Sequence, residues 1–268
     1  MIALRQELLN ERIGCIIHDV DLSRPSAEQL SGIKSALKKH LVVFFRDQSL
    51  SPQTLYNLAC KLGIPTPYPF VTGIDGLPEV VEIIKKPEDT VNFGGVWHSD
   101  TAYLDAPAMG ALLYGVNIPE KGGDTLFANM YEVFDSLSPD LRQFLSRLKA
   151  INNADKAAIS QTRPGGILKG LKATHPAVRT HPETKRQLLY VNRAHTTHFE
   201  NWTIEESQPL LEFLCQRIEQ PAFSCRFKWQ PGSLAFWDNR ACQHFPLNDY
   251  DGYLRKMLRV SLAGDRPV

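Results

Sequence analysis

The chain has 268 residues and a formal net charge of +1, with 30 basic and 29 acidic side chains. This length is sufficient for one large domain with a sizeable core, and we expect a single domain over residues 1–268. A net charge near zero gives no electrostatic reason to expect nucleic acid or a membrane surface as a partner.

The cysteines and the first residues bear on the cellular compartment. Five cysteines are scattered along the chain without a CxxC motif, an odd and unpatterned set that argues against a disulfide framework and for a reducing cytosol. The first residues carry charges and lack the apolar run of a signal peptide. No apolar stretch reaches the length of about 18 residues that a membrane span needs. We therefore expect a cytoplasmic protein.

The first 64 residues are expected to form a strand–helix support. Residues 14–20 are a short apolar run, and 41–46 (LVVFFR) have the length and composition of a buried strand. Ser26 with Gln29 three residues later is typical of a capping box, predicting a helix to about His40. A second helix is expected from Ser51 to near Gly63.

The middle of the chain alternates strands with two long connections. Strands are expected at 79–85, around His98, at 109–116 and at 125–128, followed by helical spacing over 130–148 with a break at Ser138-Pro139. Residues 65–76 are rich in Pro, Gly and aromatic residues, and residues 152–173 are polar. Connections of this kind often serve as lids or binding loops, and we expect both to do so.

The last part of the chain is rich in short strands. They are expected at 188–192, 224–230, 233–238, 241–245 and 255–263, with a helix over 203–218 capped by Thr203. Many short strands with inserted helices indicate a mainly β fold with flanking helices (α+β). Its core, at about 78–263, is expected to be a double-sheet jelly roll.

The segment Val96-Trp97-His98-Ser99-Asp100 predicts a metal site. In a strand, residues i and i+2 point to the same face, so His98 and Asp100 can hold one ion. A second histidine from a later strand would complete a two-His-one-carboxylate set, and His244 is our choice among the eight histidines. Such a set leaves open positions on iron(II) for a chelating co-substrate and dioxygen. The alternative for an isolated His-x-Asp is a hydrogen-bonded histidine without metal.

Two arginines on the last strand predict anion binding. Arg255, Met257, Arg259 and Ser261 share one face, and the opposite face is mostly apolar. If the apolar face packs on a neighbouring layer, both guanidinium groups point inward and each needs an anion. Arginine binds carboxylates and sulfonates through a planar fork of donors. Alternatively, the arginines pair with internal Asp or Glu, or lie on an exposed edge.

Taken together, these segments resemble a known family. The blocks, in order, are VWHSD, GGDTLFANMYEVFDSLSP, HPAVRTHPETKRQLLYVN, WDNRACQH and RKMLRVSLAGDRP. They resemble the taurine dioxygenase / 2,4-D dioxygenase (TauD/TfdA) family of non-haem Fe(II)/2-oxoglutarate-dependent dioxygenases, over most of residues 10–268. The resemblance implies a double-stranded β-helix (cupin-like) core, in agreement with the jelly roll.

The resemblance also implies residue roles. It makes His98, Asp100 and His244 the ligands of Fe(II). Arg255, eleven residues after His244, and Thr125 in the GGDT block are then the partners of 2-oxoglutarate. The expected reaction is hydroxylation with dioxygen, giving succinate and CO2 as co-products. A carboxylate at residue 100 argues for hydroxylation over halogenation, and Asn239 and Arg240 are interpreted as structural.

The substrate side departs from taurine dioxygenase. Tyr68 keeps a pocket tyrosine, but Pro65 and Gly94 replace a pocket histidine and asparagine, and His195 falls where that enzyme has a phenylalanine. We therefore do not expect taurine itself to be the substrate. The residues that we expect to contact the substrate, with Arg259 holding its anionic group, are Tyr68, Thr101, Tyr103, His195 and Arg259.

The substrate is expected to be a small anionic molecule: a sulfonate, a sulfate ester, an aryloxyalkanoate or an amino-acid-like compound. One alternative is a biosynthetic oxygenase of the same family that hydroxylates or desaturates a natural-product precursor. Others are an inactive binding homologue and a zinc or manganese cupin-like isomerase, which would not need Arg255. Members of the family are often dimers or tetramers, so a homo-oligomer is compatible with the resemblance.

Overall fold

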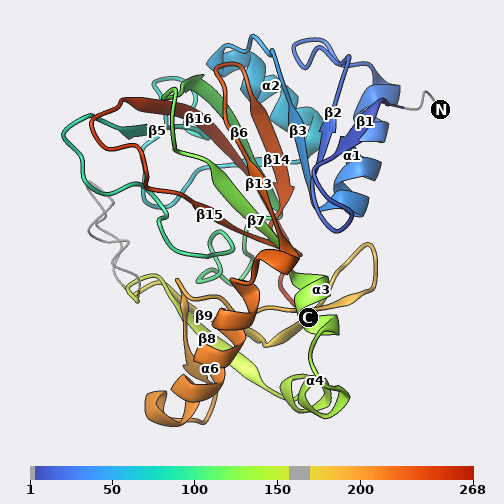
Figure 1. Ribbon diagram of the computed structural model, residues 1–268, viewed down its shortest axis with the longest axis vertical. Helices are drawn as coiled ribbons and strands as arrows, with labels where there is room; N and C mark the ends of the chain where they lie inside the picture. Colours follow the sequence, from blue (N-terminus) through green and yellow to red (C-terminus); the bar gives the residue numbers. More distant parts are fainter. Residues whose placement is uncertain (1–3, 157–169) are drawn as a thin grey trace.

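Two β-sheets pack face to face in the computed structural model, which describes residues 4–156 and 170–268 (Figure 1). The larger sheet has eight strands in the order β1-β2-β3-β14-β6-β16-β4, with β5 also paired to β16. Its strands are β1 (Gln6–Leu8), β2 (Cys15–Ile17), β3 (Val42–Phe45), β4 (Pro65–Thr66), β5 (Val80–Lys85), β6 (Gly110–Asn117), β14 (Leu234–Asp238) and β16 (Arg255–Leu262).

The smaller sheet faces the larger one and has the order β13-β7-β15. Its strands are β7 (Thr125–Asn129), β13 (Ser224–Phe227) and β15 (Cys242–Pro246). Aromatic side chains join the two layers: Phe44 stacks on Phe227 with ring centroids 4.0 Å apart, and Phe127 lies 5.9 Å from Trp237. The double-sheet jelly-roll core expected from the sequence is confirmed.

Two helices, α1 (Ala27–His40) and α2 (Pro52–Leu62), cover the outer face of the larger sheet (Figure 1). Their apolar sides pack in one cluster with the outward side chains of β16 and β14. Ser26 and Gln29 form the predicted capping box, so α1 begins where the sequence placed it. The first 64 residues thus contain the strands β1, β2 and β3 and the helices α1 and α2.

A second layer of structure lies beyond one end of the sandwich (Figure 1). It contains α3 (Met130–Asp135), α4 (Pro139–Leu145), α6 (Ile204–Ile218), the short helix η1 (Pro221–Phe223), β8 (Lys149–Asn153), β9 (Lys172–Pro176), β10 (Val178–Thr180), β11 (Gln187–Leu189) and β12 (Thr196–Phe199). The break at Ser138-Pro139 and the Thr203 cap are as predicted.

The strands β8 and β9 correct the expected loop at 152–173. They pair antiparallel, so both ends of the expected loop belong to a sheet. The sequence signal was weak because both strands are short and largely polar. The part of this connection at 157–169 lies outside the described residues. In the other expected loop, 65–76, the first two residues form β4.

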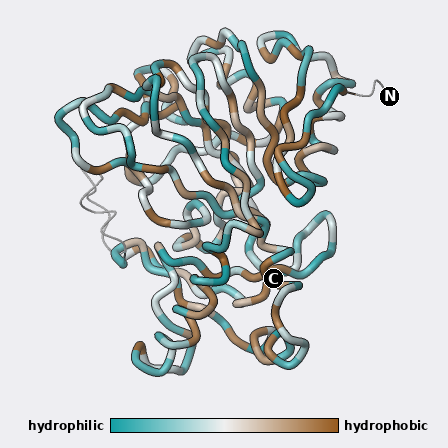
Figure 2. Tube along the Cα trace, viewed as in Figure 1, coloured by the Kyte–Doolittle hydropathy of each residue, from teal (hydrophilic) through white to brown (hydrophobic). Residues whose placement is uncertain are grey.

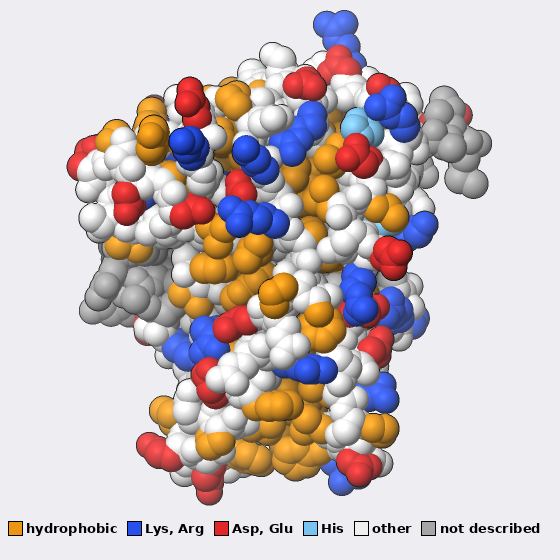
Figure 3. Space-filling view, in the orientation of Figure 1, with side chains coloured by type: hydrophobic (Ala, Val, Ile, Leu, Met, Phe, Trp, Pro, Cys, Tyr) orange, Lys and Arg blue, Asp and Glu red, His pale blue; other side chains and the backbone are white. Residues whose placement is uncertain are grey.

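Apolar residues are concentrated in the interior and charged residues on the surface. Apolar segments follow the central strands (Figure 2), and the face in Figure 3 carries acidic and basic side chains interspersed. None of the described helices is long and apolar enough to cross a membrane.

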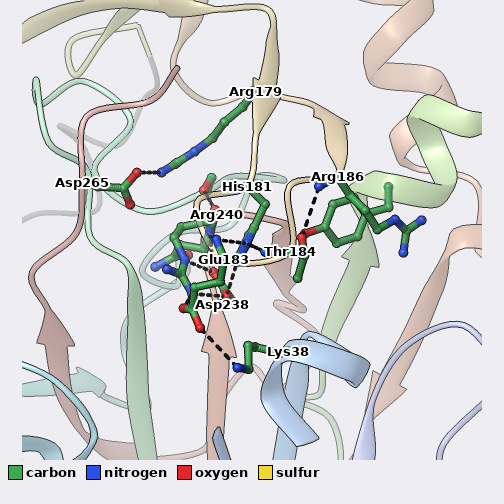
Figure 4. Close-up of polar contacts among 12 residues, drawn as sticks. Lys38, Arg179, His181, Glu183, Thr184, Arg186, Asp238, Arg240 and Asp265 are labelled. Atoms are coloured by element: carbon green, nitrogen blue, oxygen red, sulfur yellow. Dashed lines mark hydrogen bonds and ion pairs between the residues drawn. The ribbon is translucent and has the colours of Figure 1, made fainter. Parts of the chain in front are cut away.

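A buried carboxylate at the end of β14 ties three parts of the fold together (Figure 4). Arg240 donates to both oxygens of Asp238 at 2.8 and 2.7 Å, and His181 Nε2 lies 3.1 Å from Oδ2. Glu183 accepts from Arg240 at 2.8 Å, and its other oxygen lies 3.5 Å from Lys38 Nζ on α1. This network fastens the β10–β11 hairpin to β14 and α1, so Arg240 has the structural role inferred from the sequence.

Replacing Asp238 by asparagine is expected to destabilise the fold by about 3 kcal/mol, because it removes the charge around which Arg240 and His181 are arranged. Burial alone would raise the pKa of Asp238, but hydrogen bonds from Arg240 and His181 lower it from 3.8 to about 2. A carboxyl with a depressed pKa stabilises the fold above its unfolded pKa and loses that contribution as the pH falls through its folded pKa. Urea unfolding should therefore show a gap between wild type and Asp238→Asn that is constant near neutral pH and narrows toward pH about 2. A gap that is independent of pH would contradict the assigned ionic role.

Candidate metal centre and anion cavity

Backbone pairing brings two histidines together. His98 N donates to His244 O at 3.1 Å, and His244 N donates to His98 O at 2.9 Å, an isolated antiparallel bridge at the edge of β15. The imidazole centroids are 4.1 Å apart. The predicted pair of histidines is therefore in place, although they are 146 positions apart in the chain (244 − 98).

The expected strand around His98 is wrong in its geometry. Only His98 bridges to β15, and the chain turns at Asp100 into Thr101, which has φ 51°. The physical reason is Asn239: its carbonyl accepts from Ser99 Oγ at 2.7 Å and its side chain accepts from Asp100 N at 3.3 Å. These bonds draw the segment away from β15 and place the Asp100 carboxylate beside the histidines.

Three side chains offer ligand atoms to one metal ion. Asp100 Oδ1 lies 3.6 Å from His98 Nε2 and 3.9 Å from His244 Nε2, and a ligand atom of each residue lies within 4.8 Å of the others. His98 Nδ1 is 2.7 Å from the carbonyl of Val96, which directs Nε2 toward the site. This is the two-His-one-carboxylate donor set that suits iron(II).

The protonation states also suit a metal. Burial and the neighbouring His98 hold the pKa of His244 well below its ordinary value, so the imidazole is neutral. Burial would raise the pKa of Asp100, but Arg259, His244 and His98 hold it well below the ordinary value, so the carboxylate is ionised. Asp100 Oδ2 and His244 Nδ1 are buried without a hydrogen-bond partner in the described part of the chain. Neutral imidazole and ionised carboxylate are the forms that bind metal, and the residues fit the group.

Arg255 brings a buried positive charge into the same cavity, with the Tyr250 hydroxyl as its hydrogen-bonding neighbour and the Asp124 carboxylate acting on it electrostatically. It is 6% exposed, and its Nε and Nη2 have no hydrogen-bond partner among the described residues. Its guanidinium lies 5.8 Å from the Trp229 ring and 5.7 Å from the Tyr250 ring. A Cβ at Gly123, which has φ 72°, would lie 3.3 Å from Arg255 Nε, so the GGDT turn needs glycine there. A buried guanidinium with unpaired donors is an anion site.

Thr125, at the start of β7, lines this cavity with Arg255. Its Oγ1 accepts from Trp229 Nε1 at 2.9 Å, which leaves the hydroxyl hydrogen for another acceptor. Both predicted metal histidines and both arginines reach the cavity, whose lining is Ile83, Phe93, His98, Leu113, Thr125, Phe127, Trp237, His244, Pro246, Arg255 and Arg259. An anion on Arg255 and a metal on the histidines would therefore share one space.

Arg259 differs from Arg255. Its Nη2 lies 2.8 Å from Asp100 Oδ1, and its guanidinium lies 5.0 Å from the Tyr68 ring. Both arginines are buried and share the inner face of β16, as predicted. An internal carboxylate thus lies within ion-pair distance of Arg259, as the alternative interpretation had it. Its Nε and Nη2 nevertheless have no hydrogen-bond partner among the described residues, so donors remain for an external anion.

The expected substrate residues lie in different places around the metal ligands. The Tyr103 ring is 4.9 Å from His195, and His195 is 6.2 Å from His98. Thr101 is buried and accepts from Ala108 N at 2.8 Å; with Tyr68 and Ser261 it lines a neighbouring cavity.

Some neighbours of the site were missed by sequence reasoning. Phe93 lies 5.9 Å from Tyr68, and Phe70 lies 5.4 Å from Tyr103, so both belong to the aromatic wall. The aromatic-rich composition of 65–76 was the available signal for Phe70. A Cβ at Gly94, which has φ 76°, would lie 2.9 Å from His98 Cε1, so glycine here leaves the histidine edge open.

The sequence and the fold are similar to those of known proteins. The family model described as "Taurine catabolism dioxygenase TauD, TfdA family" matches residues 6–261. An alkylsulfatase of Acinetobacter baylyi is 30% identical, covering 98% of this chain and 86% of that protein. An alpha-ketoglutarate-dependent sulfate ester dioxygenase of Pseudomonas putida is 30% identical, covering 96% and 88%. The crystal structure of a taurine dioxygenase from Burkholderia xenovorans is similar with a TM-score of 0.87 and 34% identity, covering 99% of this chain and 91% of that one.

Proposed function

Because the chain belongs to the TauD/TfdA family of Fe(II)/2-oxoglutarate-dependent dioxygenases, we propose that 2-oxoglutarate binds in the cavity between Arg255 and the two histidines. The enzyme uses iron(II), 2-oxoglutarate and dioxygen, and its organic substrate is small and anionic. The observation that carries the binding mode is the buried guanidinium of Arg255, whose Nε and Nη2 have no hydrogen-bond partner among the described residues.

His98, Asp100 and His244 are the proposed iron ligands. Bound iron would supply dioxygen activation coupled to oxidative decarboxylation of 2-oxoglutarate, with succinate and CO2 as co-products. The chain's own part is to hold His98 through the carbonyl of Val96, to keep His244 neutral and to keep Asp100 ionised. The neutral imidazole and the ionised carboxylate favour a bound metal ion, whose positive charge would compensate the buried negative charge of Asp100.

Arg255 and Thr125 are the proposed partners of the distal carboxylate of 2-oxoglutarate. The guanidinium can donate in a planar fork, and the Thr125 hydroxyl can add a further donor. Leu113 and Phe127 contribute apolar side chains to the lining of the same cavity, which limits contact with water there. Exclusion of water strengthens the charge-assisted bonds that fix the co-substrate's orientation.

Arg259, Tyr68, Thr101, Tyr103 and His195 are the proposed substrate residues. Within the anionic class we favour alkyl sulfates and sulfonates, because an aromatic wall lies beside Arg259 and the relatives include an alkylsulfatase and a sulfate ester dioxygenase. Hydroxylation would occur at the carbon next to the ester oxygen of a sulfate or the sulfur of a sulfonate. The hydroxylated product would then break down to an aldehyde and release sulfate or sulfite, respectively. Pro65 and Gly94, in place of polar pocket residues, argue against taurine.

The test begins with anaerobic Fe(II) protein titrated with 2-oxoglutarate, monitored by the visible charge-transfer band of the chelate. Oxygen is then admitted with hexyl sulfate, hexanesulfonate, phenoxyacetate, taurine or uncharged 1-hexanol, and succinate is measured. We expect a band, and succinate formation that is strongest with the hexyl anions and weak with taurine and 1-hexanol. A band with equal succinate from 1-hexanol would contradict the anionic substrate, and no band would contradict the binding mode.

A further inference from the structure

One oxygen of Asp100 faces every charged or metal-binding neighbour. Oδ1 lies 2.8 Å from Arg259 Nη2, 3.6 Å from His98 Nε2 and 3.9 Å from His244 Nε2. The second oxygen, Oδ2, is buried and has no hydrogen-bond partner among the described residues. The oxygen nearest to both imidazole nitrogens is therefore also the one in ion-pair contact with the guanidinium, whose Nε and Nη2 make no hydrogen bond within the described residues.

Arg259 has little else to balance its charge. It is 4% exposed, and within the described ranges its one ion-pair partner is Asp100. Its remaining neighbours are rings, with Tyr68 at 5.0 Å and Trp237 at 5.8 Å from the guanidinium. A divalent ion at the same carboxylate would bring two further positive charges next to this one. Repulsion between buried charges is weakly screened, so the guanidinium opposes the metal.

We propose that Arg259 couples substrate binding to metal affinity. Without a substrate anion, its guanidinium competes with the metal for Asp100 Oδ1; an anion that binds Arg259 compensates its charge and relieves the competition. Metal and anion then tighten each other's binding by the same factor, as linkage requires. This inference rests on the proposed function and extends it: the charge of the substrate would help to determine the affinity of the site for its metal.

Arg255 provides a matched control on the same strand. It lies four residues away on the same face of β16, is similarly buried, and lines the same cavity. Unlike Arg259, which is in ion-pair contact with Asp100, it has the Tyr250 hydroxyl as its hydrogen-bonding neighbour in the described part of the chain. Arg255→Gln therefore removes a buried positive charge from the cavity while leaving the Asp100–Arg259 contact intact.

The first experiment measures the Mn(II) dissociation constant, from free Mn(II) by electron paramagnetic resonance, without 2-oxoglutarate or substrate. At a pH high enough for the Asp100 carboxylate to be ionised in every variant, we expect Arg259→Gln to bind Mn(II) about 5-fold more tightly than wild type, and Arg255→Gln to stay within about 2-fold. Equal or weaker binding by Arg259→Gln would overturn the competition. Arg259→Lys, which keeps the charge, should resemble wild type; tightening in that variant would also count against the proposal.

The second experiment adds hexyl sulfate or 1-hexanol to the wild-type protein and repeats the Mn(II) titration, so it does not depend on a variant folding. Hexyl sulfate should lower the dissociation constant by about 5-fold, and 1-hexanol should not. If succinate formation depends on hexyl sulfate while the Mn(II) constant does not move, the coupling is wrong and the proposed function stands. If neither the chelate band nor succinate appears, the proposed function fails, and the comparison of Arg259→Gln with wild type still decides the competition.

Discussion

Alanine in place of His244 is expected to lower substrate-dependent succinate formation by at least about a thousandfold, since a catalytic metal supplies several kcal/mol of the rate enhancement. The variant should also lose the chelate band, because one of the three ligand side chains is gone. His244 Nδ1 makes no hydrogen bond to the described residues, so its removal strands no polar partner. Circular dichroism should therefore show a retained fold.

His18→Ala is the control for this change. His18 lies in the N-terminal support, paired with Glu7 at 2.9 Å, and its removal should leave turnover and the band unchanged. If the turnover of His244→Ala were within about tenfold of wild type, His244 would not be a metal ligand. Asp100→Ala should also be inactive, but it leaves Arg259 buried without its counter-ion and should unfold more easily, so it is the less decisive variant.

Arg255→Gln is expected to weaken 2-oxoglutarate binding by about 10- to 150-fold, the equivalent of the roughly 1.5–3 kcal/mol of a hydrogen bond to a charged group. The same change should leave the thermal midpoint of the metal-free, co-substrate-free protein unchanged or raise it. Burial of a guanidinium with unpaired donors opposes folding, and glutamine removes that charge while keeping much of the side chain. Titration of the chelate band measures the first effect, and calorimetry the second.

The matched control is Lys256→Gln, one residue along β16. Lys256 points to the opposite face and pairs with Glu82 at 2.6 Å, so its loss should not change 2-oxoglutarate binding. If Arg255→Gln bound 2-oxoglutarate within about twofold of wild type, or if it destabilised the unliganded protein by several kcal/mol, Arg255 would have an internal partner and would not be the co-substrate site.

Local signals in the sequence predicted much of the fold. Ser26 and Thr203 start helices through side-chain caps that involve residues only three positions away, and the inward face of β16 follows from the alternation of the strand. The short polar strands β8 and β9 were not predictable in this way. Their pairing depends on what lies across from them, which local composition does not show.

In the candidate site too, features set by local sequence were predictable and features set by distant residues were not. The residue types and their spacing predicted His98, Asp100 and His244 as a ligand set, and the structure brings them together. The turn at Asp100 was not predicted, because it depends on Asn239, which is distant in the chain. The alternation of side chains along the strand predicted that Arg259 points inward. It could not show that the Asp100 carboxylate would lie close to it.

The bridge between His98 and His244 also sets the order of events during synthesis. Ser99 and Asn239, which shape the Asp100 turn, are 140 residues apart, and His244 follows later still. A nascent chain that ends before β15 therefore has His98 and Asp100 but lacks His244, the third donor, and cannot close the site. Metal capture must come after nearly the whole domain has been translated, and once in place the ion acts as a cross-link between its early and late segments. Loading the metal should consequently slow global unfolding more than it slows the fraying of α1 or β1, which lie outside the loop that the ion closes.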